Sequence, residues 1–227
     1  MRQEYGQFCP VALSSEVLAE RWTLLVVREL LAGARRFNEI RRGIPRLSPT
    51  LLKERLRTLE HAGVVARVSG NTPGAANYTL TQAGEELSAV ICAIGQWGQR
   101  RARDSRPQDF DPGWLVWAMD RRLNLKAMPA GRTVIEIEFA DAPAKQRRFW
   151  LEHHAGRVEL CLKDPGFDIA VRVATPVRVL AEVWRGIRPI KEEIRAGGLQ
   201  LVGTREACRA FPAWLLLSVF APIKRER

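Results

Sequence analysis

Residues 47–60 contain the polar side chains whose types and spacing best suit hydrogen bonding to an anionic partner. The segment reads Leu47-Ser48-Pro49-Thr50-Leu51-Leu52-Lys53-Glu54-Arg55-Leu56-Arg57-Thr58-Leu59-Glu60. Ser48 can cap a helix with its hydroxyl, and Pro49 suits the first helical position. Leu52, Leu56 and Leu59 recur at helical spacing and form one buried stripe, which leaves the polar side chains outside it. This pattern predicts either a helix that reads DNA or a solvated amphipathic helix.

Arginines on both sides of this segment could contact a phosphate backbone. Arg36 lies in a short arginine-rich helix that is interrupted at Gly43-Ile44-Pro45, because proline disfavours a helical residue before it. Arg67 lies in a strand that is followed by the turn formers of residues 71–74 and by a returning strand. Helix, break, helix and hairpin is the order of a winged helix-turn-helix, although the hairpin alone could be an ordinary surface feature. The candidate DNA-binding residues are Arg36, Ser48, Thr50, Lys53, Arg57 and Arg67.

Cys9 is the one residue with a plausible covalent chemistry. It precedes Pro10 at the predicted start of a helix, where the helix dipole favours a thiolate and lowers the thiol pKa. One hypothesis is that oxidation of Cys9 alters DNA affinity. The alternative is a small residue that packs between two copies of the chain. The other cysteines, Cys92, Cys161 and Cys208, are expected to be inert core residues.

Catalytic and metal-binding patterns are not found in the sequence. The neighbouring His153 and His154 would point apart in a strand or turn, and no third ligand is in view, so a solvated turn is expected. There is no Ser/His/Asp arrangement, phosphate-cradling glycine loop or acid pair at catalytic spacing. The sequence therefore predicts a protein that is not an enzyme and that uses no metal and no cofactor.

Composition agrees with a polyanionic partner. The 227 residues carry a formal net charge of +11 at pH 7, which favours nucleic acid first and an anionic membrane second. No apolar run approaches the roughly 18–20 residues that span a bilayer. The first residues lack the apolar core of a signal peptide, and the cysteines are widely scattered. These features predict a cytoplasmic protein with no membrane association, no disulfide framework and no zinc site.

Helices before and after the predicted helix-turn-helix complete this half of the chain. One helix is expected from Pro10 to about residue 20, and a strongly apolar one over residues 21–31 ends before Gly33. A long helix is expected over residues 81–103, at about 34 Å for 1.5 Å per residue. It is longer than a small winged domain needs for its own core. We therefore expect a dimerisation helix, with a domain-capping helix as the alternative.

These motifs together resemble HxlR-type winged-helix transcriptional regulators over about residues 5–103. The resemblance implies a homodimer that binds double-stranded DNA at an inverted repeat. The wing tip, residues 71–77, lacks the strongly basic residue that this family has there. The matching stretches are Cys9-Pro10-Val11, Arg21–Leu30, Arg36–Ile40, Ser48–Leu52, Leu56–Glu60, Gly63–Arg67, Tyr78–Gly84 and Trp97-Gly98.

The second half of the chain is predicted to be a separate α+β domain. We expect domain boundaries at 1–103 for the DNA-binding and dimerisation domain, 104–113 for a proline-punctuated linker, and 114–227 for the second domain. Consecutive strand patterns followed by helices indicate an α+β layer with a mostly antiparallel sheet. Ile135, Ile137 and Phe139 alternate with Glu136 and Glu138, which predicts a sheet with one wet face.

This second half resembles sterol-carrier-protein-like domains. The resemblance rests on residues 181–190 and 194–204, which include Trp184-Arg185-Gly186 and Val202-Gly203-Thr204. The family often has an acidic residue after the last glycine, where this chain has Thr204. The resemblance implies an apolar tunnel between sheet and helices that can hold a lipid-like molecule. The alternative is a packed core that only extends the dimer.

The whole sequence therefore predicts a sequence-specific transcriptional regulator, with repression as its expected action. It would bind an inverted-repeat operator as a homodimer and respond to a hydrophobic small molecule or to thiol oxidation. The alternative is a carrier of lipids or other hydrophobic small molecules that the winged-helix domain merely dimerises.

Overall fold

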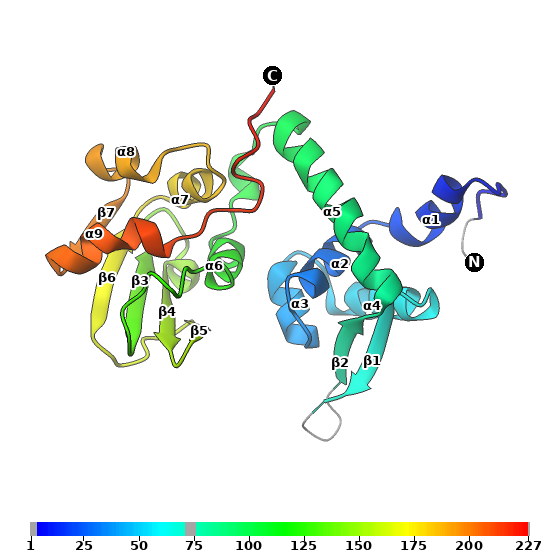
Figure 1. Ribbon diagram of the computed structural model, residues 1–227, viewed down its shortest axis with the longest axis horizontal. Helices are drawn as coiled ribbons and strands as arrows, with labels where there is room; N and C mark the ends of the chain where they lie inside the picture. Colours follow the sequence, from blue (N-terminus) through cyan, green and yellow to red (C-terminus); the bar gives the residue numbers. More distant parts are fainter. Residues whose placement is uncertain (1–3, 71–75, 227) are drawn as a thin grey trace. The chain divides into compact units, whose positions relative to one another are not determined.

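The computed structural model describes residues 4–70 and 76–226, and the chain divides into two compact units, Met1–Gln96 and Trp97–Arg227 (Figure 1). The predicted turn at 71–74 lies outside the described residues. Within the described part of the chain, no helix is long and apolar enough to cross a membrane. The fold is α+β, with a winged helix-turn-helix in the first unit and a five-stranded sheet in the second.

The first unit contains the predicted helices and hairpin in the predicted order. Its elements are α1 (Pro10–Leu18), α2 (Thr23–Leu31), α3 (Phe37–Gly43), α4 (Pro49–His61), β1 (Val65–Ser69), β2 (Ala76–Leu80) and α5 (Gln82–Arg101), whose last residues belong to the second unit. Strands β1 and β2 pair antiparallel and form the wing. Helix α2 begins two residues later than its apolar pattern predicts, because Trp22 has a left-handed backbone with φ of 82°.

One apolar core joins α2, α3, α4 and the wing. Val26 and Leu30 of α2 and Ile40 of α3 are fully buried, as are the predicted leucines Leu52 and Leu59 of α4. Burial of each such side chain is worth about 1.5–3 kcal/mol relative to exposure. The core therefore fixes which face of α4 remains at the surface.

The end of α3 is held by an ion pair of α2, in which the carboxylate is buried. Glu29 is 1% exposed, and its side chain pairs with Arg28 at 2.7 Å. Arg28 also donates to the carbonyl of Gly43 at 2.9 Å. A Cβ on Gly43 would lie 1.9 Å from Oε2 of Glu29, so the close approach of α3 to α2 requires glycine at this position.

The second unit is a mixed sheet with helices on one face. Its strands are ordered β5-β4-β3-β6-β7; β3 and β6 run parallel, and all other pairs are antiparallel, so the sheet is mostly antiparallel as predicted. The helices are α6 (Pro112–Asp120), α7 (Val177–Trp184), α8 (Ile190–Arg195) and α9 (Arg205–Trp214). The strands are β3 (Thr133–Glu138), β4 (Arg148–His154), β5 (Arg157–Cys161), β6 (Ile169–Ala174) and β7 (Gln200–Gly203), with 3-10 turns at Pro107–Asp109 and Ala144–Gln146.

Alternate residues of the central strands pack against α6, α7 and α9. Ile135 and Ile137 of β3 share a core with Leu180 of α7 and with Phe211 and Trp214 of α9, and all five are at most 1% exposed. The rings of Phe211 and Trp214 meet edge to face at 6.3 Å, an arrangement that adds to the burial energy. Large side chains thus occupy the layer where the sterol-carrier resemblance implies a tunnel. That resemblance stays a prediction.

The opposite face of this sheet is not wet at its centre, and the prediction for Glu136 was wrong. Glu136 is 1% exposed because two arginines from neighbouring strands lie over it. Arg172 of β6 pairs with Glu136 at 2.8 Å and Arg148 of β4 approaches it at 3.6 Å. Glu138, the other predicted polar position, is half-buried and pairs with Arg148 at 3.2 Å. A buried carboxylate needs such pairing, because leaving it unpaired is costly.

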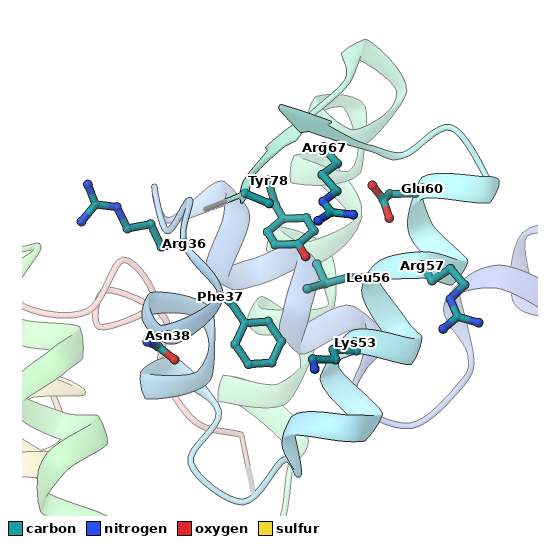
Figure 2. A pocket seen from close by; sticks show the side chains of 10 residues that line it. Arg36, Phe37, Asn38, Lys53, Leu56, Arg57, Glu60, Arg67 and Tyr78 are labelled. Carbon is teal, nitrogen blue, oxygen red and sulfur yellow. The ribbon is translucent and has the colours of Figure 1, made fainter. Parts of the chain in front are cut away.

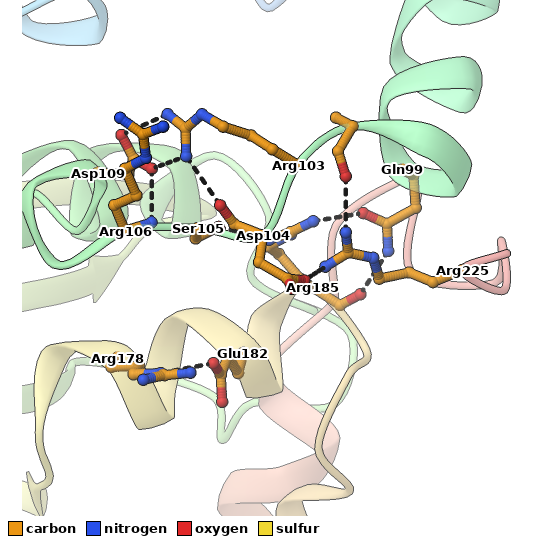
Figure 3. Close-up of polar contacts among 11 residues, drawn as sticks. Gln99, Arg103, Asp104, Ser105, Arg106, Asp109, Arg178, Glu182, Arg185 and Arg225 are labelled. Carbon is orange, nitrogen blue, oxygen red and sulfur yellow. Dashed lines mark hydrogen bonds and ion pairs between the residues drawn. The ribbon is translucent and has the colours of Figure 1, made fainter. Parts of the chain in front are cut away.

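Polar side chains within the second unit hold the last turn of α5 (Figure 3). Arg185, at the end of α7, donates to Oε1 of Gln99 and to the hydroxyl of Ser105, both at 3.0 Å. Arg225 pairs with Asp104 at 2.7 Å. Burial, together with the nearby charge of Arg225, lowers the pKa of Arg185. The end of α5 is therefore an integral part of this unit.

Candidate DNA interface

A basic hollow of about 600 Å³ lies between α3, α4 and the wing. Figure 2 shows the side chains that line it. Four cationic side chains, from all three elements, surround apolar side chains that lie between them. The lining residues are Arg36, Phe37, Asn38, Lys53, Leu56, Arg57, Glu60, Arg67, Ala76 and Tyr78.

Lys53 and Arg57 of α4 lie at the surface beside this hollow because the start of the helix and its buried face are both fixed. The amide of Leu51 donates to the hydroxyl of Ser48 at 3.2 Å, and Pro49 occupies the first turn. With about 100° between successive residues, burial of the leucine stripe turns Lys53 and Arg57 outward. Both side chains are exposed.

The start of α3 forms the opposite wall. The backbone amides of Arg35 and Arg36 both donate to Oε2 of Glu39 at 2.9 Å, which caps the helix and leaves the Arg36 side chain 71% exposed. The amide of Tyr78 donates to the carbonyl of Arg35 at 2.7 Å. Strand β2 is therefore joined to the start of α3, and this joint brings Tyr78 to the hollow.

Of the six predicted DNA-binding residues, the structure brings four together. Arg36, Lys53, Arg57 and Arg67 line the hollow, with Arg67 placed across the wing from Tyr78 by the strand register. Ser48 and Thr50 are exposed at the start of α4 and are not among the lining residues.

Sequence reasoning missed several lining residues. Glu60 follows Arg57 by three positions and Lys53 by seven, so helical spacing alone would have found it. Asn38 and Tyr78 carried no such signal, because they reach the hollow through the pairing of β2 with the start of α3.

Cys9 is exposed and stands at the start of α1. The backbone amides of Ala12 and Val11 lower the pKa of its thiol. This agrees with the effect expected at a helix start, and the sensing role stays a prediction. The prediction that Cys92 is a core residue was wrong, because Cys92 is exposed on α5. Cys161 and Cys208 are partly buried.

Large apolar side chains are exposed on α1 and α5. No residue of α1 is buried; Val11 is 71% exposed and Leu13 51% exposed. On α5, Val90, Ile94 and Trp97 are 41%, 46% and 61% exposed and follow one another at helical spacing. Exposed apolar side chains of this size are typical of a surface that contacts a protein partner.

Comparison with known proteins assigns a family to the part of the chain that contains the hollow. The model of the HxlR-like helix-turn-helix family matches residues 17–106. The uncharacterized HTH-type transcriptional regulator YvaP of Bacillus subtilis is 40% identical over 94 residues, which are 40% of this chain and 87% of YvaP. The chain belongs to the HxlR-like helix-turn-helix family. It is thus a DNA-binding transcriptional regulator, and the matched residues include every residue that lines the hollow.

Two further relatives match the same part of the chain. The uncharacterized HTH-type transcriptional regulator Mb3122 of Mycobacterium bovis is 45% identical over 91 residues, which are 39% of this chain and 56% of Mb3122. The HTH-type transcriptional regulator YodB of Bacillus subtilis is 38% identical over 94 residues, which are 40% of this chain and 84% of YodB. The HxlR-like match ends at residue 106, before the five-stranded sheet begins.

Proposed function

We propose that this regulator represses transcription by binding an inverted-repeat operator as a homodimer, with α4 in the major groove. The observation that carries this proposal is that Arg36, Lys53, Arg57 and Arg67 all belong to the lining of one hollow. They come from three elements, and one acidic side chain, Glu60, lies among them. A surface of this charge suits the phosphates and base edges of a duplex.

Each basic side chain has a role that follows from its element. Lys53 and Arg57 project from α4, the element that enters the groove, so they would reach base edges; arginine and lysine favour guanine there. Arg36 and Arg67 lie on the two flanking walls and would hold the phosphate backbone. Ser48 and Thr50 stand at the start of α4, where hydroxyls and the helix dipole favour phosphate.

The apolar surface of α1 and α5 supports a homodimer as the DNA-binding form. Two copies would bury the exposed side chains of Leu13, Val90 and Ile94, which a single chain leaves in water. A symmetric dimer would place two α4 helices in successive major grooves, about 34 Å apart. This geometry fits an operator built as an inverted repeat.

The signal that the regulator answers would come from a hydrophobic small molecule in the second unit or from oxidation of Cys9. Either signal acts only if it favours one dimer geometry over the other. The exposed thiol with its lowered pKa supports the oxidation route. If a Cys9→Ser variant lost operator affinity on peroxide, hypochlorite or quinone treatment as the wild type does, this route would be excluded.

Binding to upstream intergenic DNA at several salt concentrations tests the proposal. Each phosphate contact contributes about −0.9 to the slope of log affinity against log salt. Arg36→Ala should weaken binding to every sequence and make this slope shallower by about that amount. Lys53→Ala and Arg57→Ala should also lose about 1–3 kcal/mol of discrimination between operator and mutated operator.

Arg157→Ala is the matched control, because Arg157 is an exposed arginine on β5 of the second unit. It removes the same charge and should leave operator binding unchanged. Unchanged operator affinity in Arg36→Ala, Lys53→Ala and Arg57→Ala would refute the assigned DNA-binding face. No DNA binding by the wild type would instead favour a carrier of hydrophobic molecules.

A further inference from the structure

Arg55 is the buried cation of α4, and it points away from the groove. It is 9% exposed. It lies two positions after Lys53 and two positions before Arg57, which places it about 160° around the helix from both. A side chain in this position cannot share a DNA surface with Lys53 and Arg57.

The guanidinium of Arg55 is bound instead to the turn that joins α1 and α2. Its Nε donates to the backbone carbonyl of Arg21 at 3.1 Å, and its Nη1 forms an ion pair with the carboxylate of Glu20. The same Nη1 lies 3.3 Å from Oε1 of Glu54 on its own helix. Two of these three partners therefore belong to another element.

The turn that Arg55 binds has a defined shape. The amide of Thr23 donates to the carbonyl of Glu20 at 3.1 Å, and Trp22 has the left-handed φ of 82°. The guanidinium of Arg21 lies 4.7 Å from the centre of the Trp22 ring. This turn follows α1, the helix that bears the exposed apolar side chains. It forms a fixed support on which a second element can be positioned.

Chemistry explains why this contact is specific. A buried guanidinium is costly without partners, and its planar fork can bond a carbonyl and a carboxylate together in one geometry. Lysine offers a point charge without that fork. The leucine stripe holds α4 against the core but fixes its rotation and its axial position less sharply than directional bonds do.

We propose that Arg55 is a positioning residue for DNA reading. It holds α4 at a fixed rotation against the α1–α2 turn through Glu20 and the carbonyl of Arg21. Operator affinity therefore depends on two side chains, Arg55 and Glu20, that do not touch DNA. This inference rests on the proposed entry of α4 into the major groove.

The test measures operator affinity of the full chain at several salt concentrations for Arg55→Lys, Glu20→Gln and the double variant. Arg55→Lys keeps the charge and should lower affinity about tenfold, with the salt slope unchanged. Glu20→Gln should lower affinity in the same direction, and the double variant should be no weaker than Arg55→Lys alone, because the two changes remove one shared interaction. Arg57→Lys is the matched control: it makes the same substitution on the groove face, where the charge still reaches the DNA, and should mainly relax sequence preference.

Circular dichroism and sedimentation of each variant accompany the affinities. Affinities of Arg55→Lys and Glu20→Gln within about twofold of the wild type would overturn the inference while the proposed function stands. A salt slope shallower by about 0.9 in Arg55→Lys would also overturn it, since Arg55 would then contact phosphate. Loss of helix content in both variants would assign the pair to stability alone. A wild type that binds no operator would overturn the proposed function and this inference together.

Discussion

At the scale of single residues, Cys9 and Cys161 lie in surroundings that shift their thiol pKa values in opposite directions. The backbone amides of Ala12 and Val11 lower the pKa of the Cys9 thiol. Burial, followed by the charges of Glu159 and Glu152, raises the pKa of the Cys161 thiol. Since the thiolate is the reactive form, the two cysteines should differ in reactivity even where both can be reached by a small reagent.

We expect Cys9 to alkylate faster than Cys161 at neutral pH, and its rate to level off at a lower pH than that of Cys161. The lowered pKa means that the Cys9 thiolate forms earlier as pH rises, while the Cys161 thiolate forms later. Iodoacetamide labelling from neutral to alkaline pH, read for each cysteine by mass spectrometry, measures both profiles. The reverse order of the two midpoints would contradict the assigned surroundings.

Residue-scale predictions from sequence succeeded where the signal was local. The spacing of Lys53 and Arg57 against the leucine stripe was enough to place both at the surface of α4, and both line the hollow; their contact with DNA stays a prediction. Glu136 was misplaced because its burial depends on Arg148 and Arg172, which reach it from other strands. Strand pairing and register between distant segments are set by tertiary contacts that alternation within one strand does not reveal.

At the scale of elements, the contact between α2 and α3 is the tightest point of the helix-turn-helix. Glu29 fills the space where a side chain at residue 43 would lie. It is buried and cannot swing into water at low cost. The spacing of the two helices therefore depends on Gly43, which has no side chain to collide with Glu29.

Gly43→Ala should lower the free energy of unfolding of the first unit by about 1–3 kcal/mol, because the added methyl displaces Glu29. Gly98→Ala is the control: Gly98 lies in α5 with no neighbouring atom within 4 Å of the added Cβ. Alanine there should be neutral or stabilising by up to about 1 kcal/mol. Calorimetric Tm values of the two variants check this. Equal Tm values would show that the Glu29 side chain moves aside at little cost in stability.

Element boundaries were predictable from the sequence where capping residues are present. Ser48 and Pro49 mark the start of α4. As expected, the Ser48 hydroxyl accepts a hydrogen bond from the amide of Leu51, and Pro49 lies in the first turn. The start of α2 was predicted two residues early because the left-handed backbone of Trp22 has no counterpart in the apolar pattern. Arg55 contacts the same turn through the carbonyl of Arg21, and such a tertiary contact cannot be read from the apolar pattern of α2.

At the scale of the whole molecule, the proposed homodimer rests on the exposed apolar side chains of α1 and α5. The predicted domains, 1–103, 104–113 and 114–227, remain a proposal beside the two compact units at Met1–Gln96 and Trp97–Arg227. The fold class could be read from the sequence of both units, because helix periodicity and strand alternation are local. The hollow between α3, α4 and the wing could not be read in full, because it forms only when three elements meet.

Leu13→Glu and Ile94→Glu should each shift the protein toward a monomer and weaken operator binding, since a buried carboxylate in an apolar interface is costly. Leu216→Glu is the control, because Leu216 is an exposed leucine of the second unit at 41% exposure. Sedimentation velocity measures the mass of each variant. A wild type that sediments as a monomer at every concentration would favour α5 as a capping helix.

The joint at the start of α5 has a mechanical consequence. The hydroxyl of Thr81 donates to the carbonyl of Gly63 at 2.6 Å, and a Cβ on Gly84 would lie 2.2 Å from the carbonyl oxygen of Val64. The base of the wing and the first turn of α5 are thus held in close contact. A helix of 20 residues is a lever arm of about 30 Å. For a straight helix of this length, a sideways displacement of about 3 Å at the far end corresponds to a rotation of about 6° at the first turn, so we expect a small displacement of α5 to act on the wing as a tilt.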